Sequence, residues 1–401
     1  MLKMTYRFAC VILTAAFFGG SMNAQSYLHQ VFVLNEGWSN WQTGEMMEPA
    51  TLGVYDPGLQ SYAVVDTLED AGFVSDAFLL NERLYVAADG QLLMYDANSF
   101  ALLASTEATG IRRMAHAEGL IYITRGDVDE TGMNLSFDAY LQWFDAETLL
   151  LEGELQVNAG PQYATEGIVL IENQLFIGVN NAFDWGNEVG KIGRFDLNME
   201  EYQEWDLGEE GKNPNHLFAS GGQILSVNNR DYGSTSISVL NPPSESVETV
   251  LVSDANAGCL AAMMDGETLK YQITGEGQVR QSLISSPAAS TVWLEDSPAY
   301  YGVIIDPVSG DWYGSVTDYS TYGYIEIRDT EGALQGEFDC GVSPGVLCAD
   351  VRNISQVTDI DFDRTSFGAP IDAIGRKTHA SANGFEMIIG ADGKKAVRAR
   401  Q

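Results

Sequence analysis

The sequence predicts an all-β fold, a seven-bladed β-propeller closed by a C-terminal strand, from three observations. One short unit of alternating strands and tight turns recurs seven times between residues 25 and 353. The first copy lacks a strand that the other copies have, and an isolated strand stands after the last copy. Glycine is abundant (41) and proline scarce (11), as expected for many short strands joined by glycine turns.

The clearest copy of the unit runs from Asn81 to Ser105 and reads NERLYVAADGQLLMYDANSFALLAS. It consists of a turn, an alternating strand, a tight turn, a strand that ends in Tyr-Asp, and a further strand. The other six copies begin at Gln30, Glu118, Glu172, Gly221, Asp265 and Ser309. A fixed repeat of this kind is the sequence signature of a propeller, in which each copy forms one blade.

The two ends of the repeat region predict how the ring closes. Six copies are preceded by an additional strand, such as VSDAFLL or IRRMAHA, but the copy at Gln30 is not. The segment Ser343 to Asn353 (SPGVLCADVRN) has the pattern of that additional strand and no copy behind it. We therefore expect it to complete the first blade, which removes exposed sheet edges. A β-sandwich, the competing fold, explains neither the seven copies nor the half-units at the ends.

The unit NERLYVAADGQLLMYDANSF and the opening VFVLNEG with TLGVYDP resemble the YVTN-repeat, surface-layer-type seven-bladed β-propellers. The resemblance covers residues 25 to 353. It implies the propeller fold but no single activity, because this architecture carries many functions. Related exported propellers capture cobalamin for an outer-membrane transporter; they are lipoproteins, and this sequence has no lipid-attachment cysteine.

Both ends of the sequence predict export. Residues 1–24 have the basic start, apolar run and small-residue end of a signal peptide, and the apolar run is too short to span a membrane. After a linker at 354–369, residues 370–401 resemble a type IX secretion sorting tail, with a small accessory hairpin or a disordered end as the alternative. We expect a protein that is secreted or held at the cell surface after outer-membrane export, with the periplasm as the alternative location.

The charge excludes some partners. The formal net charge is −35, and the acidic excess lies between residues 25 and 353, since the two ends of the chain are basic. Nucleic acids and anionic membranes are disfavoured because binding to them depends on Lys and Arg. Solubility explains the acidic surface most simply. The alternative is that the acidic surface captures cationic ligands or calcium. We expect a monomer that does not span the membrane and has no cofactor, with calcium as the one possible exception.

Three cysteines follow the predicted signal peptide. Cys340 and Cys348 flank one Gly/Pro turn, so they are the plausible disulfide pair in an exported protein, and Cys259 is expected to be buried and inert. No CxxC motif is present, which removes the usual support for a metal-thiolate or thiol-redox site.

Motifs of catalysis are missing from the sequence. It contains no HExxH, GxSxG or GxxxxGK[ST] motif and no complete calcium-binding loop. His116 and His216 could meet in a propeller channel, but a hydrogen-bonded structural histidine is more common than a ligand. No catalytic residue is predicted, the metal content is unknown, and an enzyme is less expected than a binding protein.

One set of loops carries the candidate site. In a four-stranded blade, the connections from the second to the third strand and from the outermost to the next innermost strand emerge on the same face, where ligands usually bind. The residues predicted to bind ligand on this face are Trp38, Trp41, Arg112, Arg125, Tyr163, Asn180, Trp185, His216, Asn228, Arg230, Tyr232, Tyr301, Tyr319 and Tyr322. Their aromatic, amide and charged groups suit a ligand with flat faces and polar edges.

These features favour an exported, non-catalytic propeller that captures a small ligand of the corrinoid or glycan class, or a protein partner, on one loop face. The first alternative is a propeller enzyme of the lactonase or lyase type, with a channel metal held by groups such as Asn180, Asn228 and Asp318. The second is a surface-layer or adhesion module with an acidic, calcium-dependent shell.

Overall fold

The computed structural model describes residues 25–40, 43, 45–129 and 131–354 and two strands near the C-terminus. Residues Ser26–Arg352 form one compact unit, and the two strands near the C-terminus belong to a second unit. In the second unit the described strands β31 (Phe385–Ile389) and β32 (Lys395–Ala399) pair antiparallel. The predicted signal peptide, residue Trp41, and the predicted linker and sorting tail apart from these two strands lie outside the described residues.

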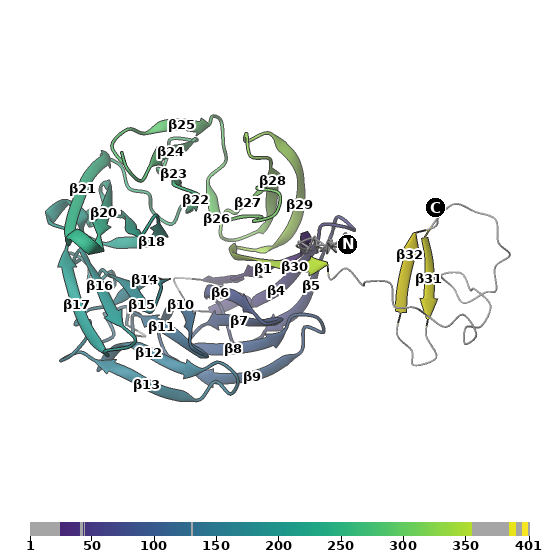
Figure 1. The fold of residues 1–401 in the computed structure, drawn as a ribbon, viewed down its shortest axis with the longest axis horizontal. Coiled ribbons are helices and arrows are strands. Elements are labelled where there is room, and N and C mark those ends of the chain that lie inside the picture. Colours follow the sequence, from purple (N-terminus) through teal and green to yellow (C-terminus); the bar gives the residue numbers. More distant parts are fainter. Residues whose placement is uncertain are drawn as a thin grey trace, which may run out of the picture. The chain divides into compact units, whose positions relative to one another are not determined.

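Seven four-stranded sheets make up the larger unit and follow one another around a ring (Figure 1). From the innermost to the outermost strand, they are β30 (Pro344–Ile354), β1 (Gln25–Asn35), β4 (Ala50–Asp56) and β5 (Ser61–Leu68); β6 (Val74–Leu80), β7 (Arg83–Ala88), β8 (Gln91–Asp96) and β9 (Leu102–Glu107); β10 (Ile111–Ala117), β11 (Leu120–Arg125), β12 (Ala139–Asp145) and β13 (Leu151–Gln156); β14 (Thr165–Ile171), β15 (Gln174–Val179), β16 (Lys191–Asp196) and β17 (Glu201–Asp206); β18 (Pro214–Ser220), β19 (Gln223–Asn228), β20 (Thr235–Asn241) and β21 (Ser246–Ser253); β22 (Ala262–Asp265), β23 (Thr268–Gln272), β24 (Val279–Leu283) and β25 (Thr291–Leu294); and β26 (Tyr300–Ile305), β27 (Trp312–Val316), β28 (Tyr322–Arg328) and β29 (Leu334–Val342). The predicted seven-bladed propeller is confirmed.

Short elements decorate the loops of the ring. A hairpin formed by β2 (Trp38–Asn40) and β3 (Glu45–Glu48) lies between β1 and β4. Three single-turn 3₁₀ helices are present, namely η1 (Glu209–Gly211), η2 (Arg230–Tyr232) and η3 (Pro242–Ser244). None of the described helices is long and apolar enough to cross a membrane.

The closing strand lies where the sequence predicts it. Strand β30 is the innermost strand of the first blade and pairs with β1, so the first blade joins both ends of the repeat region. The backbone N–H groups of Glu36 and Gly37 also donate to the carbonyl oxygens of Ser343 and Val342, at 2.8 and 3.0 Å. The first and last blades are thereby joined by hydrogen bonds as well as by packing.

An aspartate at the end of the third strand explains the recurring Tyr-Asp signal. In the second blade, Oδ1 of Asp96 accepts hydrogen bonds from the backbone N–H groups of Asn98 and Ser99, at 3.0 and 2.7 Å. The same side chain-to-backbone turn occurs in the first, third, fourth and seventh blades, at Asp56, Asp145, Asp196 and Asp329. Such turns favour the tight reversal into the outermost strand, which is why the aspartate recurs.

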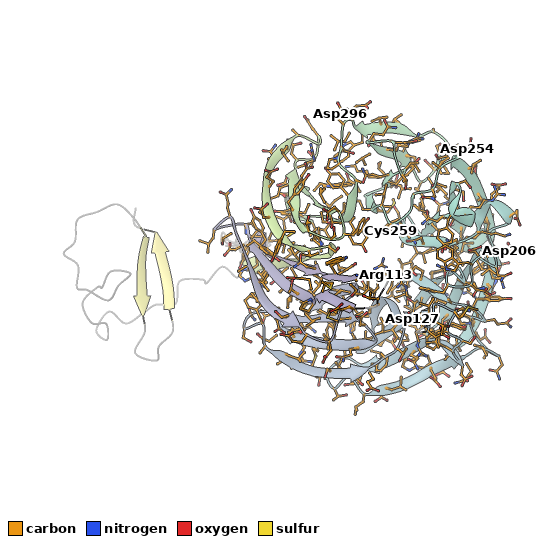
Figure 2. The ribbon with its side chains drawn as sticks, turned by 180° about the vertical axis from the view of Figure 1, so that it is seen from behind. Arg113, Asp127, Asp206, Asp254, Cys259 and Asp296 are labelled. Atoms are coloured by element: carbon orange, nitrogen blue, oxygen red, sulfur yellow. The ribbon has the colours of Figure 1, made fainter. Side chains whose placement is uncertain are left out.

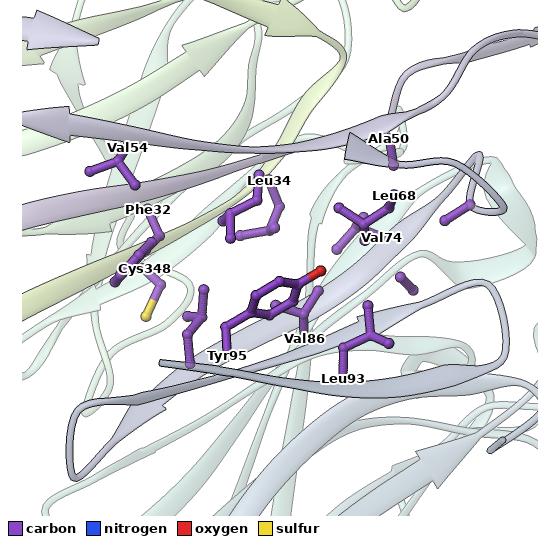
Figure 3. Packing of buried hydrophobic residues seen from close by; sticks show 14 of the residues in the cluster. Phe32, Leu34, Ala50, Val54, Leu68, Val74, Val86, Leu93, Tyr95 and Cys348 are labelled. Carbon is purple, nitrogen blue, oxygen red and sulfur yellow. The ribbon is translucent and has the colours of Figure 1, made fainter. Parts of the chain in front are cut away.

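Seven apolar clusters, one between each pair of neighbouring blades, form the core. Figure 3 shows the cluster between the first and second blades, which contains Phe32, Leu34 and Val86. Each blade therefore buries both of its faces against its neighbours. Consecutive residues of β30 point to opposite faces, so Leu347 packs between the seventh and first blades while Cys348 packs between the first and second.

The expected disulfide is absent. Cys340 and Cys348 are both free and buried, and they belong to two different apolar clusters on opposite faces of the first blade. The disulfide prediction is wrong because the turn between the two cysteines passes from one blade to the next: Cys340 lies on β29 of the seventh blade, whereas Cys348 lies on β30 and points to the far face of the first blade. Cys259, expected to be buried, is exposed.

We predict that deleting residues 343–401 opens the ring, whereas deleting 355–401 leaves it closed. The longer deletion removes β30 and exposes the apolar surface that Leu347 and Cys348 cover, with an expected loss of at least about 3 kcal/mol. Melting curves of the two variants measure the difference. Identical melting of both variants and the full chain would refute this closure.

We also predict that a water-soluble thiol reagent labels Cys259 much faster than the other two cysteines in a chain without residues 1–24. Burial raises the pKa of both Cys340 and Cys348 to about 12, so these thiols are protonated as well as shielded at neutral pH. Labelling followed by mass spectrometry identifies the modified residue, and the Cys259→Ser variant is the control. Fast labelling of that variant in its folded state would contradict the packing of Cys340 and Cys348.

Candidate functional site

The innermost strands all begin on one face of the ring, and in six of the seven the second residue lies at the mouth of the central channel. These second residues are Ser75, Arg112, Glu166, Asn215, Tyr301 and Gly345, from six different blades. The sixth blade contributes Cys259 from the segment before β22. Together with Glu36 and Phe73, they surround a cavity of about 170 Å³, which we call the mouth cavity. Figure 2 shows Arg113 and Cys259 at the centre of the ring.

A β-bulge recurs near the start of the innermost strands. The pairing of the innermost strand with its neighbour shifts register near its start in β6, β10, β14, β18 and β26. A β-bulge bends the strand and redirects its side chains, and bulges of this kind are common beside functional sites. In β6, β10, β14 and β18 the second and third residues therefore both line the channel, and the third residues lie in a deeper cavity.

The deeper cavity has a volume of about 260 Å³ and adjoins the mouth cavity, with which it shares Arg113, Asn215 and His216. Burial raises the pKa of Asp76 in its wall to about 6, against the lowering effect of Arg113. Burial, together with the charge of Arg113, lowers the pKa of His216 to about 4, so this imidazole is neutral at pH 7. His216 Nε2 lies 3.2 Å from the carbonyl oxygen of Leu260 and must donate to it, which leaves Nδ1 as an acceptor.

A buried ion pair fixes one side of the mouth cavity. Arg112 binds Glu166 with two hydrogen bonds, Nε to Oε2 at 2.8 Å and Nη2 to Oε1 at 3.1 Å. The rings of Phe73 and Phe183 lie 5.6 and 5.1 Å from the guanidinium carbon. Burial alone would raise the pKa of Glu166, but the charges of Arg112 and Arg113 outweigh it and lower the pKa. The pair is therefore ionised and rigid.

An unusual carboxyl group lies on the other side. Glu36 is only 9% exposed, and its Oε1 accepts a 2.8 Å hydrogen bond from the hydroxyl group of Tyr301. Burial raises the pKa of Glu36 to about 7, although the Tyr301 hydrogen bond and both arginines oppose the increase. Gly345 makes room for this contact, because a Cβ atom there would lie 2.2 Å from Oε1. The ring of Tyr319 packs edge-on against Tyr301, with 5.0 Å between centroids.

The structure brings only some of the predicted residues to the channel. Arg112, His216 and Tyr301 line the mouth cavity. Tyr319 does not line it but packs against the ring of Tyr301. Sequence reasoning missed Glu36, Phe73, Glu166 and Cys259. Glu166 occupies the same place in its repeat as the predicted Arg112 and Tyr301, so aligning the seven copies at that position could have found it.

A second group of predicted residues forms the outer rim of the same face. Trp185 is 75% exposed and stacks on Tyr232, with 5.3 Å between ring centroids, while the Tyr232 hydroxyl donates to the carbonyl oxygen of Ala182. Arg230 pairs with Glu210 at 2.6 Å. Of the remaining predicted aromatic residues, Tyr322 is exposed and Trp38 and Tyr163 are half-buried.

Three predicted residues hold the scaffold through hydrogen bonds to neighbouring strands and loops. Asn228 and Asn180 have no exposed surface, and the carboxamide of Asn228 bonds to hydroxyl groups of neighbouring serines. Arg125 donates to the carbonyl oxygens of Thr109 and Ala139. Neither Asn180 nor Asn228 lines either of the two cavities, and no group of three or more His, Cys, Asp or Glu side chains with metal-binding geometry occurs among the described residues.

The fold and this channel define the chain as a seven-bladed β-propeller with a polar, partly charged cavity at the channel mouth. A solved chain of Kuenenia stuttgartiensis hydrazine synthase is similar, with a TM-score of 0.55 and 12% identity over 82% of this chain and 96% of that chain. At this identity the likeness shows the shared fold alone. No family model and no curated protein matches the sequence, so the YVTN-repeat and sorting-tail resemblances stay predictions.

We predict that Glu36→Gln stabilises the protein at pH 8 by about 1–3 kcal/mol and has little effect at pH 5. A carboxyl group whose pKa is raised on folding destabilises the folded state as the pH rises from about 4.5 to 7, and glutamine removes that ionisation. Denaturant unfolding at both pH values measures the difference. The exposed Glu337→Gln is the control, and an equal effect of Glu36→Gln at pH 5 and pH 8 would contradict the prediction.

Proposed function

We propose that this propeller is a binding protein that captures a small polar ligand at the mouth of its central channel. The observation that carries the proposal is the convergence of side chains from all seven blades on one cavity. Ligand sites in folds of this kind combine a pre-formed hollow with a few oriented polar groups, and the Arg112–Glu166 pair and the Glu36–Tyr301 contact supply such groups.

The size of the cavity bears on the ligand classes expected from the sequence. At about 170 Å³, the mouth cavity is smaller than the usual range of drug-sized sites, roughly 300–1,000 Å³. A single sugar unit or another molecule of few heavy atoms suits it. A corrinoid would have to lie across the loop face, where Trp185 and Tyr232 offer a stacked aromatic surface.

We further propose that the protein acts after export, as the signal-like residues 1–24 and the sorting-like tail at 370–401 suggest. Mass spectrometry of protein from the producing cells should find an N-terminus at Gln25 and a C-terminus before residue 370. Recovery of the intact chain from the cytoplasm would contradict export.

Calorimetric titration against mono- and disaccharides, a corrinoid, short peptides and amino acids tests the binding function. We expect at least one of these classes to bind, and Asn215→Phe to weaken that binding at least tenfold, because the phenyl ring would fill the two cavities that Asn215 lines. The exposed Asn198→Phe is the matched control. Turnover of a ligand, or binding that Asn215→Phe leaves unchanged, would refute the proposal.

A further inference from the structure

The charges around the mouth cavity do not all cancel. Arg112 and Glu166 neutralise each other through two hydrogen bonds. The side chain of Arg113 is a third exposed, its Nη1 donates to the carbonyl oxygen of Ser75, and its Nε lies 3.9 Å from a Glu166 oxygen that Arg112 already holds. Arg113 therefore keeps part of its hydrogen-bonding capacity for a group inside the cavity.

Glu36, when ionised, is an opposite charge without an ion-pair partner. Among the side chains that the structure describes, no Lys, Arg or His lies within ion-pair distance of its carboxyl group. The Tyr301 hydroxyl satisfies Oε1, but no described side chain donates to Oε2. A buried carboxyl group that lines a cavity and has only one neutral donor is poorly compensated, unless a ligand supplies the second partner.

Glu36 and Arg113 together determine which ligand charges the mouth cavity accommodates. An anion would pair with Arg113 but would face Glu36 and, below it, Asp76. A cation would pair with Glu36 but would face the positive charge of Arg113. A neutral molecule would leave ionised Glu36 without a charged partner and the remaining donors of Arg113 without a charged acceptor, whereas a molecule with one charge of each sign engages both groups.

We propose that the mouth cavity binds a small zwitterion, with its ammonium group on Glu36 and its carboxylate on Arg113, as in a free amino acid. The inference rests on the proposed binding function and specifies its ligand class. The surroundings agree with this orientation. Tyr301, which holds Glu36, presents an aromatic ring, and ammonium groups bind favourably at aromatic faces. The neutral His216 adjoins Arg113 and adds no competing positive charge.

Calorimetric titration of the full chain with each of the common amino acids tests this inference. For the tightest of them, the amide derivative, which lacks the carboxylate, and the N-acetyl derivative, which lacks the ammonium group, are titrated next. We expect each derivative to bind at least tenfold more weakly than the amino acid, because each loses one charge-assisted contact.

Two variants assign the ends of the ligand. Glu36→Gln should weaken binding of the amino acid at least tenfold and leave binding of the N-acetyl derivative unchanged or make it tighter. Arg113→Gln should weaken binding of the amino acid by a similar factor and leave binding of the amide derivative unchanged. Glu337→Gln, which removes an exposed charge on β29, should change neither.

The inference is overturned if no amino acid binds, or if a derivative binds as tightly as the amino acid itself. Because the analogues are titrated against the unaltered protein, this outcome does not depend on whether the variants fold. A sugar or corrinoid that binds and is blocked by Asn215→Phe would then keep the binding function and exclude the zwitterion. Failure of every ligand class would remove both.

Discussion

Ring closure in the first blade is the constraint on which the rest of the structure depends. Every blade buries apolar side chains on both faces, so no blade can be completed until its two neighbours are in place. Strand β30 meets this requirement where the two ends of the repeat region come together, and it does so with alternate side chains directed into two different apolar clusters. The channel, its bulges and its cavities exist only because the ring is closed.

Closure and the candidate site are also linked directly. Gly345, the second residue of the closing strand, leaves the space in which Glu36 and Tyr301 meet. Glu36 follows the first strand of the chain, Tyr301 begins the last full blade and Gly345 comes later still. Residues from both ends of the repeat region therefore share one wall of the mouth cavity, and the carboxyl group with the raised pKa lies at this junction.

The fold could be predicted from the sequence because one local pattern of alternating strands, with an aspartate at many of its turns, occurs seven times along the chain. The incomplete copies at the two ends then predicted how the ring closes. The site could not be predicted in the same way. Asn180 and Asn228 occupy loop-like sequence that matches a binding rim, yet burial and hydrogen bonds to neighbouring strands make them structural. Glu36 and Glu166 were hidden among many acidic residues, since burial and pairing, which distinguish them, depend on the closed ring. The cysteine pairing failed for a similar reason, because it required knowledge of which blade each strand joins and which face of that blade each side chain occupies.

The recurring bulge at the start of the innermost strands has a consequence for how such a site can diverge. Equivalent positions in separate blades meet at one cavity, and each side chain there is carried by its own sheet. A substitution at one of these positions alters the chemistry of the cavity with little effect on the packing between blades. Selectivity can thus change through combinations of substitutions at equivalent positions of separate blades, without any change in loop length.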